Sequence, residues 1–81
     1  MFINKAPDGG NNISGPKIAA LRKQLHISQR ELADELQLRG LDIDKNAIQR
    51  IESRQRFITD IELQIFAAFF KITIDELICS K

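Results

Sequence analysis

Lys45, Asn46, Gln49 and Arg50 stand at spacings that place them together on one face of a helix. Asn can form two hydrogen bonds with the edge of adenine, and Arg or Lys can do the same with guanine. Each such pair discriminates against a wrong base by ~1–3 kcal/mol. The alternative interpretation is an ordinary solvated helix face, so the elements that position these side chains decide between the two.

Two short amphipathic helices are predicted around these residues, each with its own start signal. Ser28 and Glu31 form an S-x-x-E capping box, in which each side chain bonds to the backbone N–H of the other residue. This box predicts a helix from residue 29 to about residue 37. Asp44 can accept from the free N–H groups of a second helix, which we expect over residues 45–53.

The connection between these two helices, residues 38–43, is longer than the turn of a tight helix-turn-helix unit. Gly40 is the position at which we expect a positive φ. Leu41 and Ile43 are apolar in an otherwise polar stretch, so at least one of them should pack on the core. The length of the connection leaves open how the second helix is oriented.

The spacing of apolar residues in the rest of the chain predicts three more helices and no strand, so the expected fold class is all-α. Pro16 suits the first turn of a helix over residues 16–25, because the N–H that proline lacks would have no partner there. Two further capping boxes begin at Thr59 and Thr73. They predict a fourth helix that runs to about Phe70 and a short final helix.

Residues 1–14 contain a run of turn formers and no apolar period, so we expect a flexible N-terminal arm. The chain has 81 residues, of which 43% are hydrophobic, and this suffices for one compact core. We therefore expect a single domain over residues 15–81. Residues 17–56 carry nine basic and six acidic side chains, whereas residues 57–81 carry two and four, so the basic side lies with the central helix pair.

The composition argues against several other classes of protein. Cys79 is the only cysteine and His26 the only histidine, so neither an intramolecular disulfide nor a zinc site is expected, and no cofactor is implied. We interpret Cys79 as an inert thiol and His26 as a capping or loop residue. No apolar run resembles a signal peptide or approaches the ~20 residues that span a membrane, which favours a cytoplasmic protein. No catalytic constellation is visible, so an enzyme is not expected, and neither is a domain for small-molecule ligands.

The predicted fourth helix is apolar on two faces. One face has the periodicity of a core stripe, and the other contains Ile61, Ile65 and Phe69. A helix that is apolar on two sides is buried on two sides. In so short a chain we interpret the second face as a homodimer interface. Its alternatives are the core of a monomer and a surface for another protein.

The order of these motifs resembles the phage-repressor/Cro-like (Xre) helix-turn-helix family. The resemblance rests on four segments and covers about residues 15–78: Ile18–Leu25, Ser28–Ala33, Ala47–Glu52 and Ile72–Leu77. It implies a compact five-helix, lambda-repressor-like DNA-binding domain. The function that it implies is sequence-specific transcriptional regulation, most simply repression, by a homodimer bound to double-stranded DNA. The alternative is a protein–protein interaction module or an antitoxin-like protein that binds its partner through the fourth helix.

The resemblance also assigns roles to individual residues. Lys45, Asn46 and Arg50, with Gln49 beside them, match positions that read base edges. Arg22 and Glu52 match a pair that in some members forms a structural salt bridge. Gln29, Arg54 and Arg56 match positions that contact the DNA backbone. Ser28 joins them because a capped helix N-terminus offers N–H groups and a positive dipole end to a phosphate.

The sequence departs from the family pattern at three places. About five residues are inserted before Asp44, and Gln37 stands where the family usually has a glycine. Arg54 and Lys71 also occupy positions that are usually glycine. The ends of the third and fourth helices are therefore expected to differ in shape from the family's.

Overall fold

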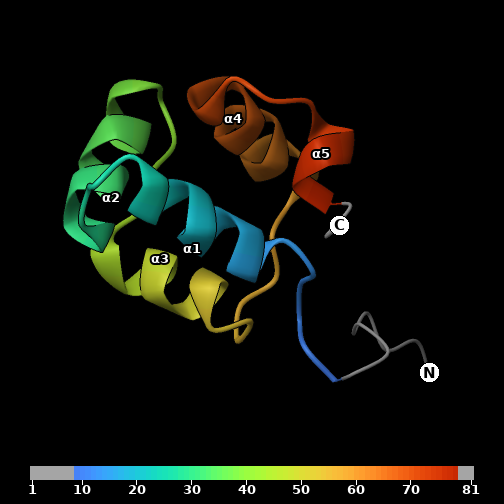
Figure 1. Ribbon diagram of the computed structural model, residues 1–81. Coiled ribbons are helices and arrows are strands. Elements are labelled where there is room, and N and C mark those ends of the chain that lie inside the picture. Colours follow the sequence, from blue (N-terminus) through green and yellow to red (C-terminus); the bar gives the residue numbers. More distant parts are fainter. Residues whose placement is uncertain (1–8, 79–81) are drawn as a thin grey trace.

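The computed structural model describes residues 9–78, which form five helices and no strand (Figure 1). The predicted all-α, five-helix fold is confirmed. Cys79 and the first eight residues of the predicted arm lie outside the described residues. The helices, in chain order, are α1 (Gly15–Gln24), α2 (Gln29–Leu38), α3 (Lys45–Glu52), α4 (Asp60–Phe70) and α5 (Ile74–Ile78).

The helices begin where the capping signals predict. Ser28 Oγ accepts from the Glu31 N–H at 3.0 Å, and a Glu31 carboxylate oxygen accepts from the Ser28 N–H at 2.8 Å. Asp44 accepts from the N–H of Ala47 at 2.8 Å. The boxes that begin at Thr59 and Thr73 form in the same way. Each cap is a local interaction that contributes roughly 1 kcal/mol.

The first four helices share one kind of ending. At the end of α2, the N–H of Leu41 donates to Leu36 O at 3.1 Å, and that of Gly40 donates to Gln37 O at 3.0 Å. This pair of bonds is the Schellman motif, and it needs a left-handed residue. Gly40 has a φ of 89°, as predicted. The equivalent residues after α1, α3 and α4 are not glycines, yet they are also left-handed, with φ of 58°, 67° and 59°: His26, Arg54 and Lys71.

Arg54 and Lys71, at two positions where the family usually has glycine, thus adopt the left-handed conformation that glycine favours. The expectation that the ends of α3 and α4 would be shaped differently is wrong for the backbone. A left-handed residue other than glycine costs roughly 1–2 kcal/mol. The bonds of the motif, together with packing of the following side chain, offset that cost. Ile27 and Ile72, which follow His26 and Lys71, both pack against the core.

All five helices contribute to a single core. The largest fully buried side chains include Ile18 of α1, Leu32 of α2, Ile51 of α3, Phe66 of α4 and Leu77 of α5. Figure 1 shows α1 in the middle of the molecule, with α2 and α3 on one side and α4 and α5 on the other. The inward stripe of each helix is therefore covered by its neighbours.

The long connection between α2 and α3 is anchored at several points. Ile43 is buried in the core and Leu41 packs against it, which confirms the prediction for this segment. The side-chain amide of Gln37 donates to Ile43 O at 2.8 Å. The guanidinium of Arg39 lies 5.1 Å from the centre of the Phe69 ring on α4. These contacts fix the position from which α3 begins.

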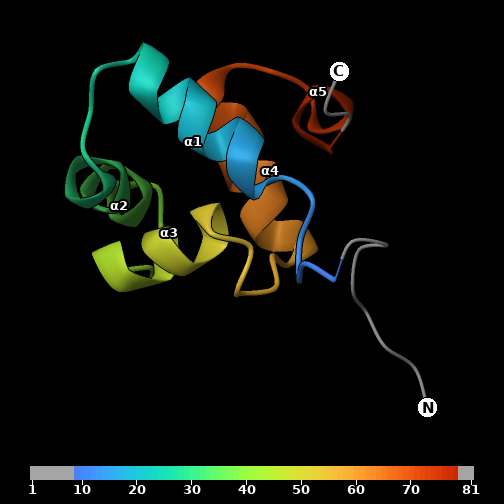
Figure 2. The same cartoon turned by 60° about the horizontal axis from the view of Figure 1, so that its bottom comes forward.

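The segment that precedes α1 is held against the turn that follows α3 (Figure 2). The Asn12 side-chain amide donates to Ile51 O at 3.1 Å and to Arg56 O at 2.7 Å, while its oxygen accepts from the Gly15 N–H at 2.8 Å. A Cβ at Gly15 would collide with the Ile51 carbonyl oxygen, so glycine permits this close approach. The last residues of the predicted arm thus join the start of α1 to the end of α3.

Candidate DNA-binding surface

The outer face of α3 carries Lys45, Asn46, Gln49 and Arg50, all four of them exposed. Ile48, on the opposite face, is fully buried, and it fixes the orientation of the helix. Within residues 9–78, none of the four side chains takes part in a hydrogen bond or an ion pair. Their donors and acceptors are consequently free to meet a ligand.

Glu52, at the end of the same helix, is the centre of a polar cluster. Its carboxylate accepts from Arg22 Nε at 2.7 Å and from Arg22 Nη2 at 3.1 Å. The remaining Nη1 of Arg22 donates to Ile27 O at 2.8 Å. The hydrogen bond with Glu52 raises the pKa of Arg22, against the opposing effect of burial. The structure thus brings together the two residues assigned to a salt bridge, and their pair ties α1 to α3.

Gln29 joins this cluster from α2. Its side-chain amide donates to Glu52 Oε1 at 3.0 Å. This bond uses one of the two N–H groups of the Gln29 amide, and the amide oxygen does not take part in it. Ser28, one residue earlier, uses its hydroxyl to cap α2. Of the two residues expected at the DNA backbone, Gln29 therefore also joins α2 to α3, and Ser28 stabilises the start of α2.

Arg54 is held by the N-terminal segment. Its Nε donates to Asn12 O at 2.8 Å. A Cβ built on Gly10 would lie 2.6 Å from the guanidinium carbon of Arg54, so the side chain passes directly over that glycine. The sequence predicts a phosphate contact for Arg54 but gives no sign of this packing, because Asn12 lies 42 residues earlier in the chain.

Arg56 forms a bidentate ion pair with Glu62 of α4, with N–O distances of 2.9 and 2.8 Å. Glu62 is 7% exposed and also accepts from the Thr59 N–H. Burial raises the pKa of Glu62, but the hydrogen bonds from Arg56 and Thr59 and the charge of Arg56 outweigh it, so the pKa lies below its ordinary value. The sequence predicts only a capping role for Glu62. The short separation of six residues between Arg56 and Glu62 is the signal that could have indicated their ion pair.

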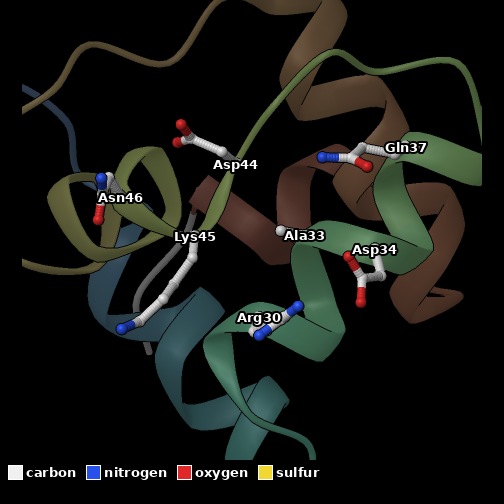
Figure 3. A pocket seen from close by; sticks show the side chains of 7 residues that line it. All are labelled: Arg30, Ala33, Asp34, Gln37, Asp44, Lys45 and Asn46. Atoms are coloured by element: carbon white, nitrogen blue, oxygen red, sulfur yellow. The ribbon is translucent and has the colours of Figure 1, made fainter.

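A cleft of about 330 Å³ lies between α2 and α3, next to the exposed α3 face (Figure 3). Arg30 and Lys45 bring positive charge to it, while Asp34 and Asp44 bring negative charge. Because the side chains that line the cleft carry charges of both signs, the cleft is not by itself an anion-binding site. The sequence-based prediction assigns no functional role to Arg30. Its position in the first turn of α2, next to Gln29, is the signal that could have indicated one. Across residues 9–78 no group of three or more potential metal ligands comes together.

The face of α4 predicted to lie in an interface is partly accessible. Ile61 is 63% exposed, and Ile65 and Phe69 are half-buried. The Phe69 ring meets Phe70 edge-on at 5.0 Å and carries Arg39 above it. The three residues therefore do not belong wholly to the core.

Two helices joined by an anchored connection, with the second presenting an unengaged polar face, define a helix-turn-helix domain. The helix-turn-helix family model matches residues 18–77, and the chain belongs to that family. It is a DNA-binding transcriptional regulator with the lambda-repressor-like fold. Neither a curated protein nor a solved structure matches the chain. No helix among residues 9–78 is long and apolar enough to cross a membrane.

Proposed function

We propose that the protein is a repressor that binds operator DNA sequence-specifically as a homodimer, with α3 in the major groove. The observation that carries this proposal is the outer face of α3, where four side chains suited to base edges have no partner within residues 9–78. Asn46 and Arg50 are suited to adenine and guanine respectively, with Lys45 and Gln49 beside them. Repression follows if the bound dimer covers DNA that the transcription machinery needs.

The proposed backbone contacts surround this face. Ser28 and Gln29 stand at the start of α2, where free N–H groups and the positive end of the helix dipole favour a phosphate. Arg54 and Arg56 would contribute mainly as fixed positive charges, because both already donate to atoms of the protein. A guanidinium has five N–H donors, so an arginine engaged in this way can still contact a phosphate.

Binding to the DNA upstream of the protein's own gene tests the proposal, since small repressors can regulate their own synthesis. Fluorescence anisotropy at a stated salt concentration would compare this DNA with a random duplex of equal length. We expect affinity at least a thousandfold higher for one segment of the upstream DNA, the lower end of the range for specific binding. Equal affinity for both duplexes would overturn sequence-specific binding there.

A second candidate function is a protein-binding module that acts through α4, favoured by the 63% exposure of Ile61. An antitoxin would combine this role with DNA binding. The two functions respond differently to substitution. Changing Asn46 and Arg50 to Ala would leave a module's activity intact, whereas Ile65→Glu would abolish it. A regulator that reads DNA through α3 would instead lose its activity when Asn46 and Arg50 are changed to Ala.

A further inference from the structure

Two consecutive asparagines of the N-terminal segment, Asn11 and Asn12, bind the turn that follows α3 (Figure 2). The side-chain amide of Asn12 donates to the carbonyl oxygen of Arg56 at 2.7 Å, and that of Asn11 donates to the carbonyl oxygen of Gln55 at 2.8 Å. The backbone N–H of Asn11 donates to Arg54 O at 3.0 Å. Consecutive carbonyl groups of the turn are therefore bound by the protein itself.

The end of α3 is already closed by its own backbone. The N–H of Gln55 donates to Arg50 O at 2.8 Å, and that of Arg54 donates to Ile51 O at 3.0 Å. The carbonyl groups of Gln55 and Arg56 lie beyond the helix, in a turn whose residues are exposed or half-buried. In an ordinary exposed turn, water satisfies such carbonyl groups. Here the asparagine amides take the place of water, and they thereby fix the backbone that carries Arg54.

The side chain of Arg54 is held by the same segment. Its Nε donates to Asn12 O at 2.8 Å, and its guanidinium lies over Gly10, where an added Cβ would come within 2.6 Å of it. A flexible arginine loses side-chain conformational entropy when a phosphate orders it, and that loss weakens binding. An arginine that the protein has already ordered avoids this loss.

We propose that Asn12, supported by Asn11, is a positioning residue for DNA binding. It holds the turn after α3 so that Arg54 meets a DNA phosphate already ordered, in a fixed relation to the outer face of α3. The Asn12 amide also donates to Ile51 O of α3 at 3.1 Å, and its oxygen accepts from the Gly15 N–H of α1 at 2.8 Å. One side chain thereby relates the turn to both helices. This inference rests on the proposed function.

A double-mutant cycle tests the inference. Asn12→Ser retains an oxygen that can accept from the Gly15 N–H, but it removes the amide that binds the turn. Fluorescence anisotropy on operator DNA compares Asn12→Ser, Arg54→Ala and the double variant with the wild-type protein. Ile13→Ala is the matched control, because Ile13 is adjacent to Asn12, is 49% exposed and has no polar side-chain group. Thermal unfolding verifies that each variant folds.

We expect Asn12→Ser to weaken operator binding by about threefold to tenfold, which corresponds to ordering one long side chain on binding. Arg54→Ala should reduce the slope of log affinity against log salt concentration by about 0.9, the value for one lost phosphate contact. In the Arg54→Ala background, Asn12→Ser should change the affinity by less than about twofold, because the residue that it positions is absent. Ile13→Ala should bind like the wild-type protein.

Additive losses of affinity in the cycle would overturn the proposal, because Asn12 would then act independently of Arg54. So would wild-type affinity of Asn12→Ser, or an unchanged salt slope of Arg54→Ala. If Asn12→Ser does not fold, Asn11→Ala takes its place in the cycle with the same outcomes, since it removes the bond to Gln55 O alone. A wild-type protein that prefers no DNA sequence refutes the proposed function, whereas a retained preference together with any of these outcomes refutes this inference alone.

Discussion

Glu52 and Arg22 are joined by two hydrogen bonds, of 2.7 and 3.1 Å, with side chains that are 8% and 13% exposed respectively. The pair links the end of α3 to α1, and Gln29 of α2 donates to the same carboxylate. Three helices thus meet at one charged group at the C-terminal end of α3. The orientation of the outer face of α3 depends on this cluster as well as on the apolar core.

Removal of one member of this pair should destabilise the fold strongly, because the other charge remains largely buried without its opposite charge. We expect Glu52→Ala and Arg22→Ala each to lower the free energy of unfolding by about 3 kcal/mol. The double variant should lose less than the sum of the two. Urea unfolding at pH 7 measures all three values, and strictly additive losses would contradict a coupled pair.

Base readout predicts a position-specific loss of affinity. Asn46→Ala and Arg50→Ala should each weaken operator binding by about 1–3 kcal/mol and relax the preference at particular base pairs. Binding to a set of duplexes with single base-pair changes checks this. Uniform weakening across the set would show that these side chains contact phosphates instead.

The lowered pKa of Glu62 predicts a stability that depends on pH. Because the folded-state pKa lies below the unfolded-state value near 4.5, ionised Glu62 stabilises the fold above that pH. The contribution is lost as the pH falls through the folded-state pKa. Glu62→Gln should cost about 2 kcal/mol at pH 7 and progressively less below about pH 4.5. Urea unfolding from pH 7 to pH 3 measures both proteins, and parallel curves would exclude this role.

Substitution of His26 by glycine should stabilise the protein. His26 is exposed and left-handed, with φ of 58°. Glycine removes the backbone strain of the folded protein, but it also raises the conformational entropy of the unfolded chain. The free energy of unfolding should therefore rise by up to about 1 kcal/mol. His26→Ala is the matched control and should bring no gain. Thermal unfolding compares the variants, and equal shifts for Gly and Ala would refute the explanation.

Arg54→Gly should have the opposite outcome, although Arg54 is left-handed as well, with φ of 67°. Its side chain donates to Asn12 O and lies over Gly10, and glycine would lose these contacts. We expect a net loss of about 1 kcal/mol. If thermal unfolding showed a gain equal to that of His26→Gly, the contacts with the N-terminal segment would contribute nothing.

The five helices and their first residues follow from local patterns in the amino-acid sequence. A capping box such as Ser28 with Glu31 spans three residues, so its bonds form wherever the local chain turns into a helix. The apolar stripe of α3 and the polar face opposite it follow from helical periodicity in the same way. Gly40 was assigned a positive φ because no other residue in the connection adopts one at so little cost.

Which polar side chains already have partners within the protein depends on how the helices pack against one another. Gln29 and Glu52 are 23 residues apart, and Arg54 and Asn12 are 42 apart, so no local pattern relates them. Their contacts depend on how α1, α2 and α3 pack around the shared core. The left-handed residue after α3 likewise depends on tertiary contacts, because packing must offset a strain that local preference would avoid. The local chain thus sets the helices, whereas their packing selects the polar groups that stay free for DNA.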